Sequence, residues 1–218
     1  MSKAFVSAIT AALAPLADPA QAAGMAAYMK NQFRYLGIAT PARRAACADL
    51  VRGFDSDAVA VAKALWKLDE REYQYVAADL LRRHAKRLDG DDLPALEALV
   101  QSKSWWDTVD ALAPTIGEIV YCERSLAARM DELIEADDFW LRRVAILHQL
   151  AWKDETDEKR LFRYCLHCAG EKEFFIRKAI GWALRQYART APEAVRGFVD
   201  RHGSKLSALS VREATKHL

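Results

Sequence analysis

The stretch Phe139-Trp-Leu-Arg-Arg-Val-Ala-Ile-Leu147 decides the fold, because its pattern returns elsewhere in the chain. Residues 174–182, Phe-Phe-Ile-Arg-Lys-Ala-Ile-Gly-Trp, lie 35 positions later and carry aromatic, basic and aliphatic residues at matching positions. Residues 104–112, Ser-Trp-Trp-Asp-Thr-Val-Asp-Ala-Leu, lie 35 positions earlier, and residues 73–80 fit about 32 positions further back. A period of this length, with two helices per unit, is typical of HEAT-like repeats. Ordinary amphipathic helices in chance register are the alternative explanation.

The rest of the chain is also predicted to be helical. Glycine, proline and aspartate residues interrupt it mostly every 12–18 residues, which corresponds to one short helix each. The sequence shows no strand-like alternation and no glycine-rich phosphate-binding loop. With 218 residues, 52% of them hydrophobic, the chain can form one substantial core. We therefore expect an all-α, HEAT-like solenoid in which residues 1–218 form a single domain whose concave surface can bind an extended partner.

The formal net charge of +2 does not by itself indicate a nucleic-acid-binding protein. The charges are nevertheless unevenly distributed: residues 101–138 carry three basic and nine acidic side chains, whereas residues 139–189 carry eleven basic and six acidic ones. Such segregation can produce a local positive field on a nearly neutral protein. Solvated helix faces would give the same counts, so charge alone leaves the function open.

The four cysteines, at positions 47, 122, 165 and 168, are too sparse for a disulfide framework, which suits a reducing compartment. Cys165 and Cys168 form one CxxC pair, but no second pair lies at the spacing of a structural zinc site. We expect these two thiols to pack in the core and the protein to bind no metal.

The N-terminal residues could be mistaken for a signal peptide because Lys3 precedes an alanine-rich run. Pro15 and Asp18 interrupt that run, and a helical stripe of apolar residues predicts an amphipathic first helix instead. The stripe consists of Phe5, Ile9, Leu13 and Leu16. No apolar run approaches the length of a transmembrane helix, so we expect a cytoplasmic protein.

Residues 103–112 combine two tryptophans with two aspartates inside a predicted helix. Trp106 and Asp110 are four positions apart and therefore share one helix face, and Lys103 lies one turn earlier. Aspartate has a poor propensity for helix interiors. The Trp–Asp pair is either a buried packing contact or the wall of a functional site, and the spacing alone does not decide between them.

Basic and aromatic residues also share a face of the predicted helix that follows Gly170. At the spacing i, i+4, i+7, i+11 stand Lys178, Trp182, Arg185 and Arg189. Lys153 follows Trp152 at the end of the preceding apolar helix. Cations interleaved with aromatic rings suit phosphate contacts and stacking. A solvated stripe is the common alternative, which the tryptophan within the stripe makes weaker.

Several long motifs, among them Ser102-Lys-Ser-Trp-Trp-Asp-Thr-Val-Asp110 and Ala179-Ile-Gly-Trp-Ala-Leu-Arg185, resemble the AlkD family of HEAT-repeat DNA glycosylases, which remove alkylated purines. The resemblance runs over nearly the whole chain. The other motifs that carry it are residues 28–44, 70–74, 140–147, 172–176 and 209–217. Together these ordered motifs are specific, whereas any one alone would not be.

The resemblance implies a catalytic cleft of four residues, each matched to a family motif: Trp106, Asp110, Arg143 and Trp182. The resemblance also implies that the concave surface is a DNA-binding groove and that the protein is associated with the nucleoid when it is bound to DNA. The residues expected to contact DNA are Tyr28, Lys103, Lys153, Lys178, Arg185 and Arg189. Of these, Tyr28 matches a cleft residue of the family, and Lys153 and Arg185 match its backbone-contacting positions. Where relatives often carry a lysine, this chain has Ala151, so one backbone contact is expected to be missing.

The reaction implied is hydrolysis of the N-glycosidic bond of N3- or N7-alkylated purines in double-stranded DNA. Such a base is cationic and leaves without protonation, while the sugar develops oxocarbenium character. Asp110 is expected to stabilise that charge and to orient the attacking water. Trp106 and Trp182 would pack on the cationic sugar, and Arg143 would hold a flanking phosphate. The base is expected to stay largely stacked, so neutral lesions such as uracil should be poor substrates. No metal or organic cofactor is required.

Two other functions remain open. One is a catalytically silent HEAT-repeat module that binds damaged or branched DNA without excising a base. The other is a scaffold that binds only proteins. Loss of a cleft residue would have favoured the silent module, and none of the four is lost. His148 lies in an apolar segment and is expected to be an interior histidine and not a catalytic base. We expect a monomer, because a solenoid that wraps one duplex needs no second subunit.

Overall fold

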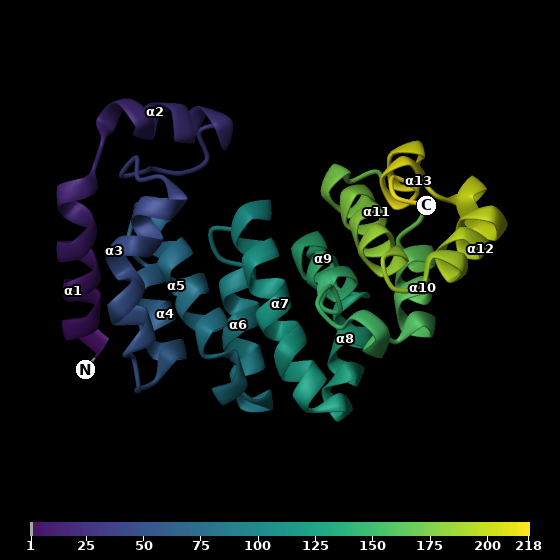
Figure 1. Ribbon diagram of the computed structural model, residues 1–218, viewed down its shortest axis with the longest axis horizontal. Helices are drawn as coiled ribbons and strands as arrows, with labels where there is room; N and C mark the ends of the chain where they lie inside the picture. Colours follow the sequence, from purple (N-terminus) through teal and green to yellow (C-terminus); the bar gives the residue numbers. More distant parts are fainter. Residues whose placement is uncertain (1) are drawn as a thin grey trace. The chain divides into compact units, whose positions relative to one another are not determined.

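The computed structural model describes residues 2–218, which form thirteen α-helices and six short 3-10 helices with no β-strand in that range. An isolated bridge between Arg34 and Glu70 is the one extended pairing within these residues. The all-α class predicted from the sequence is confirmed (Figure 1). The chain forms two compact units that divide between Arg87 and Leu88. The single domain expected over the whole chain stays a prediction.

The N-terminal unit is built from five α-helices. These are α1 (Ser2–Leu13), α2 (Pro19–Tyr28), α3 (Thr40–Arg52), α4 (Ala58–Trp66) and α5 (Arg71–Arg83). Helix α1 packs against α3 and α4, and its residues Ile9 and Leu13 are buried, as predicted for an amphipathic first helix. Leu16 is 40% exposed, so the predicted stripe is wrong at its end. The α-helix stops at Leu13, and Leu16 belongs to a 3-10 turn (Ala14–Leu16) that contains Pro15.

A buried glutamate holds the loop between α2 and α3 in the N-terminal unit. Glu72 is fully buried, and its carboxylate accepts hydrogen bonds from the backbone N–H groups of Leu36, Gly37 and Ile38, at 2.9, 2.9 and 3.1 Å. Gly37 has a φ of +87°, and a Cβ at this position would lie 2.0 Å from the carbonyl oxygen of Asp18. The motif of residues 28–44 thus contains the loop between α2 and α3, which requires glycine and is fixed by three hydrogen bonds to one carboxylate.

The C-terminal unit contains the remaining eight α-helices. These are α6 (Leu93–Val100), α7 (Trp106–Cys122), α8 (Ala127–Leu133), α9 (Phe139–Leu147), α10 (Glu158–His167), α11 (Phe174–Ala188), α12 (Pro192–His202) and α13 (Ala208–Ala214). Helix α9 packs between α7 and α11, and the three follow one another in Figure 1. The three aligned segments of the C-terminal half lie in these helices, and the fourth lies in α5. In the C-terminal unit, α7, α9 and α11 are therefore equivalent helices that pack on one another in order.

The repeat brings together a cluster of three aromatic rings at the starts of α7, α9 and α11. Trp105, Trp140 and Phe175 occupy equivalent positions, each 35 residues apart. The ring centroids of Trp105 and Trp140 are 6.1 Å apart, and those of Trp140 and Phe175 are 4.9 Å apart. Ring pairs at these distances add to the free energy gained by burial alone. The 35-residue period of the sequence thus corresponds to direct contacts between the aromatic rings of successive repeats.

Farther along the same helices, α7 and α9 approach closely at a glycine. A Cβ on Gly117 would lie 1.8 Å from the carbonyl oxygen of His148, so only glycine fits there. The Gly117 carbonyl in turn accepts a hydrogen bond of 3.1 Å from the indole nitrogen of Trp152. This contact fixes the spacing of the two helices that carry the candidate site.

His148 and the CxxC cysteines are interior residues, as expected. His148 is 1% exposed, and its Nδ1 lies 2.6 Å from the carbonyl oxygen of Ala145, while its Nε2 has no partner. Burial lowers the pKa of His148 to about 4, so the ring is neutral at pH 7. Cys165 and Cys168 are fully buried as free thiols, and burial raises the pKa of both.

Candidate active site

Asp110 and Arg143 form a two-point ion pair between α7 and α9. The Nε of Arg143 lies 2.7 Å from Oδ1 of Asp110, and its Nη2 lies 2.9 Å from Oδ2. The side chain of Arg143 is only 5% exposed, whereas that of Asp110 is 17% exposed. The remaining Nη1 donates to the carbonyl oxygen of Phe175 on α11. One guanidinium therefore ties together three successive repeat helices and leaves the carboxylate at the edge of the solvent.

The charge of Asp110 is controlled by two opposing effects. Burial raises the pKa of the carboxyl above its usual value, and the hydrogen bonds and charge of Arg143 oppose that shift. The neighbouring charge of Asp107 raises the pKa further, as a smaller effect. A partly buried carboxylate held against a guanidinium is poorly hydrated and fixed in orientation. Its interaction with a nearby cation is therefore less screened by solvent than in water, although the charge of Arg143 offsets part of it.

Trp106 begins α7 and lies one turn before Asp110. It is half-buried, and the preceding Trp105 is the extended N-cap residue of the helix. Lys103 lies in the short connection between α6 and α7 and has a φ of +51°. For a residue with a Cβ this conformation costs about 1–2 kcal/mol. The connection is thus strained at Lys103, directly before the helix that carries the Trp–Asp pair.

Helix α11 carries Trp182 and three of the predicted DNA contacts. Trp182 is half-buried, about two turns after Phe175. Lys178 and Arg185 are both bound by the carboxylate of Glu213 on α13, at 3.0 Å for Lys178 Nζ. Arg189 is the exposed C-cap residue of the helix. The predicted stripe therefore exists on one helix, and two of its cations already have an acidic partner.

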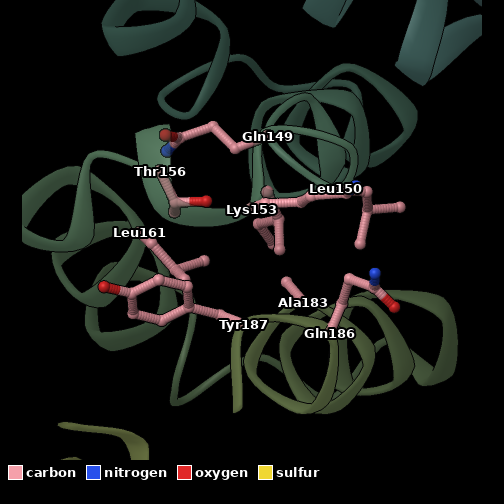
Figure 2. A pocket seen from close by; sticks show the side chains of 9 residues that line it. Gln149, Leu150, Lys153, Thr156, Leu161, Ala183, Gln186 and Tyr187 are labelled. Carbon is pink, nitrogen blue, oxygen red and sulfur yellow. The ribbon is translucent and has the colours of Figure 1, made fainter. Parts of the chain in front are cut away.

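Lys153 is exposed and begins the 3-10 helix Lys153–Glu155 with a φ of +54°. It lines a hollow between the segment that follows α9 and the facing side of α11 (Figure 2). In that view Lys153 and Leu150 face Ala183 and Gln186 across the hollow. Its volume of about 10 Å³ has room for about one water molecule. The hollow is too small to receive a purine.

Tyr28 is the last residue of α2 and belongs to the N-terminal unit. It is 74% exposed, an unusual environment for a large aromatic side chain. Together with Met25, Met29, Tyr35 and Tyr75 it lines an open hollow of about 320 Å³. The hydroxyl oxygens of Tyr35 and Tyr75 are 3.2 Å apart at this site.

The structure thus brings Asp110 and Arg143 into direct contact and places Trp106 and Trp182 on the flanking helices of the same unit. The guanidinium of Arg143, which we expected to hold a phosphate, is turned toward Asp110 and is almost fully buried. Sequence analysis missed two partners, the carbonyl group of Phe175 and the carboxylate of Glu213. Both residues lie in motifs that carry the family resemblance, but neither is of a type or spacing that indicates a role.

Within residues 2–218, no group of three histidine, cysteine, aspartate or glutamate side chains lies close enough together to hold a metal ion. In the same residues no helix is both long and apolar enough to cross a membrane.

Two comparisons with known proteins agree on one family. A family model described as DNA alkylation repair enzyme matches residues 9–218. A solved structure described as a predicted DNA alkylation repair enzyme from Enterococcus faecalis is 36% identical in sequence and superposes with a TM-score of 0.85. That match covers 93% of this chain and 96% of the other. A search of curated proteins found no significant match.

Proposed function

Because this chain belongs to the family of DNA alkylation repair enzymes, we propose that it is a DNA glycosylase that acts on alkylated purines. The substrate would be duplex DNA with a cationic N3- or N7-alkylated purine. The observation that carries the proposal is the Asp110 carboxylate, held at the solvent edge by Arg143 and lying one turn after Trp106. Phosphate binding alone would not need a buried, oriented anion.

In the proposed reaction, the bond between C1′ of the sugar and the alkylated nitrogen breaks first. The electron pair of that bond neutralises the cationic base, so the base leaves without a general acid. Positive charge then develops on C1′ and the ring oxygen of the sugar. Asp110 stabilises this charge and orients a water molecule, whose oxygen forms the new bond to C1′ and whose proton passes to Asp110 or to solvent.

Arg143 contributes by fixing Asp110. Two hydrogen bonds from one guanidinium define the plane of the carboxylate, and the third donor anchors the guanidinium on the Phe175 carbonyl. The carboxylate is therefore oriented before substrate binds. The flanking-phosphate contact expected for Arg143 would need its guanidinium to become accessible, so we assign its main role to holding Asp110.

The tryptophans and cations complete the proposed site. Trp106 and Trp182 would place their π faces on the cationic deoxyribose, each worth about 0.5–2 kcal/mol. The DNA backbone would be contacted by Lys103, Lys153, Lys178, Arg185 and Arg189, with Tyr28 contributing from the N-terminal unit. We propose that the target base stays largely stacked, so selectivity comes from the charge of the leaving base.

The rest of the proposal concerns partners and setting. A carboxylate and water suffice for this chemistry, so the proposed enzyme uses neither a metal nor an organic cofactor. We propose that it acts as a monomer with a HEAT-repeat architecture, in the cytoplasm and on the nucleoid.

The test is release of free bases from duplex DNA that has been methylated or that contains uracil. We expect release of N7-methylguanine and N3-methyladenine, and at most trace release of uracil, because uracil is a neutral leaving group. Uracil release as fast as that of N7-methylguanine would contradict the proposed source of selectivity. Duplex binding without any base release would instead indicate the silent binding module.

A further inference from the structure

Glu213 of α13 lies between two cations of α11 that are proposed to contact DNA. Its Oε1 is 3.0 Å from the Nζ of Lys178, and its Oε2 forms an ion pair with the Nη1 of Arg185. The Glu213 side chain is 17% exposed, against 38% for Lys178 and 23% for Arg185. The carboxylate is therefore the most deeply placed of the three groups, with both cations around it.

The close packing of α13 on α11 fixes this carboxylate in place. A Cβ on Gly181 would lie 2.5 Å from the Cβ of Glu213 and 2.9 Å from the Ser210 carbonyl oxygen, so glycine permits the approach. The Ser210 hydroxyl donates a hydrogen bond of 2.8 Å to the carbonyl oxygen of Arg177. Hydrogen bonding to Lys178 also lowers the pKa of Glu213, so the group is ionised at pH 7. The contact is built into the fold and is not a chance meeting of long surface side chains.

We infer that Glu213 limits phosphate-driven DNA binding, because it cancels one of the two positive charges that Lys178 and Arg185 offer to the DNA backbone. The inference rests on the proposed function, because it assumes that Lys178 and Arg185 contact DNA. Affinity for undamaged duplex depends mainly on the number of phosphate charges that are neutralised. Excision depends instead on the Asp110–Arg143 pair. A carboxylate at Glu213 therefore weakens phosphate-driven binding to any duplex while leaving the reacting groups untouched.

The test compares Glu213→Gln with the wild type in binding to an undamaged duplex at several salt concentrations. We expect the variant to bind roughly fivefold more tightly at low salt. Its plot of log K against log salt should be steeper by about one unit, because one more phosphate charge is neutralised. The matched control is Glu193→Gln on α12, which removes the same charge from an exposed ion pair with Arg196. This control should leave the slope close to that of the wild type.

Two further variants separate charge from structure. Glu213→Asp keeps the charge and should restore the wild-type slope. Lys178→Gln combined with Glu213→Gln restores the net charge of the cluster and should do the same, even if packing of α13 is weakened. Thermal unfolding of each variant reports any loss of fold separately.

The outcomes distinguish this inference from the proposed function. Equal slopes for Glu213→Gln and Glu193→Gln, or weaker binding by Glu213→Gln, would overturn the inference while leaving the glycosylase proposal standing. Failure of the wild type to bind duplex DNA would overturn the proposed function, and the inference with it.

Discussion

Arg143 and Asp110 show how a single pair of residues can be both structural and chemical. The guanidinium is buried and its three hydrogen-bonded donors connect α7, α9 and α11. Removing one partner of a buried ion pair typically costs about 3–5 kcal/mol, because the other charge is left uncompensated. Any substitution here must therefore be compared with one that disturbs a similar pair elsewhere.

Arg142, which is adjacent to Arg143 in the sequence, supplies that comparison. Arg142 makes an equivalent two-point pair with Glu171, at 2.9 and 2.8 Å. We predict that Arg143→Lys and Arg142→Lys both lower the melting temperature, because lysine cannot make the two-point contact. Only Arg143→Lys should also slow base release, by about 10–100-fold, since it alone releases Asp110. Single-turnover release measured on both variants checks this. Equal loss of activity in the two would mean that Arg143 acts through stability only.

His148 gives a prediction about pH. Its pKa is lowered to about 4 in the folded protein, whereas an unfolded histidine titrates near pH 6.5. Between about pH 4 and pH 6.5 His148 is protonated in the unfolded chain but not in the folded protein. The free energy of unfolding is therefore highest above about pH 6.5 and falls as the pH decreases toward 4. We expect a loss of about 2 kcal/mol between pH 7 and pH 5 from this residue. Urea unfolding at both pH values should show a smaller loss for His148→Gln; an unchanged loss would exclude His148 as its source.

At the scale of helices, close approach at glycines determines where the site residues meet. Gly117 lets α7 contact the backbone of α9 at His148, whereas Gly197 in α12 has only the far end of the Arg201 side chain near its Cβ position, at 3.9 Å. The two glycines therefore differ in what an added methyl group would meet, although both lie inside helices.

We predict opposite effects of the same substitution at these two glycines. Gly117→Ala should destabilise the protein by about 1–3 kcal/mol or more, because the helices must separate. Gly197→Ala should stabilise it by about 0.5–1 kcal/mol, because alanine favours the helix and meets open space. Chemical denaturation measures both. A Gly117→Ala variant as stable as the wild type would show that the α7–α9 contact is not close-packed.

The sequence predicted the helices well because helix formation follows local apolar periodicity, as at the aligned aromatic positions of Trp105, Trp140 and Phe175. It did not predict the contacts that depend on how helices cross. Glu213 meets Lys178 only because α13 crosses α11 at Gly181, and the fully buried Glu72 is explained only by the three N–H groups of a distant loop. The exposed Leu16 shows the same limit at a helix end, since the stripe continues in sequence past the point where the helix stops.

For the molecule as a whole, the net charge of +2 is too small to drive DNA binding, so the proposed affinity depends on where the charges lie. In the C-terminal unit the expected DNA contacts are Lys103, Lys153, Lys178, Arg185 and Arg189. Glu213 cancels one of these charges.

We therefore predict that the log of the affinity for undamaged duplex falls with log salt with a slope of about −4. Titration of a labelled duplex at several salt concentrations measures this slope. A slope near zero would show that these cations do not contact phosphates.

The central claim is that the charge of Asp110 drives base release, and the most direct measurement compares Asp110→Asn with Asp107→Asn. Both substitutions keep the side-chain shape and remove one charge, and both lie in the first turns of α7. Single-turnover release of N7-methylguanine should fall at least about 100-fold for Asp110→Asn with duplex affinity retained, and should stay near the wild-type rate for Asp107→Asn. Release by Asp110→Asn at the wild-type rate would contradict the account.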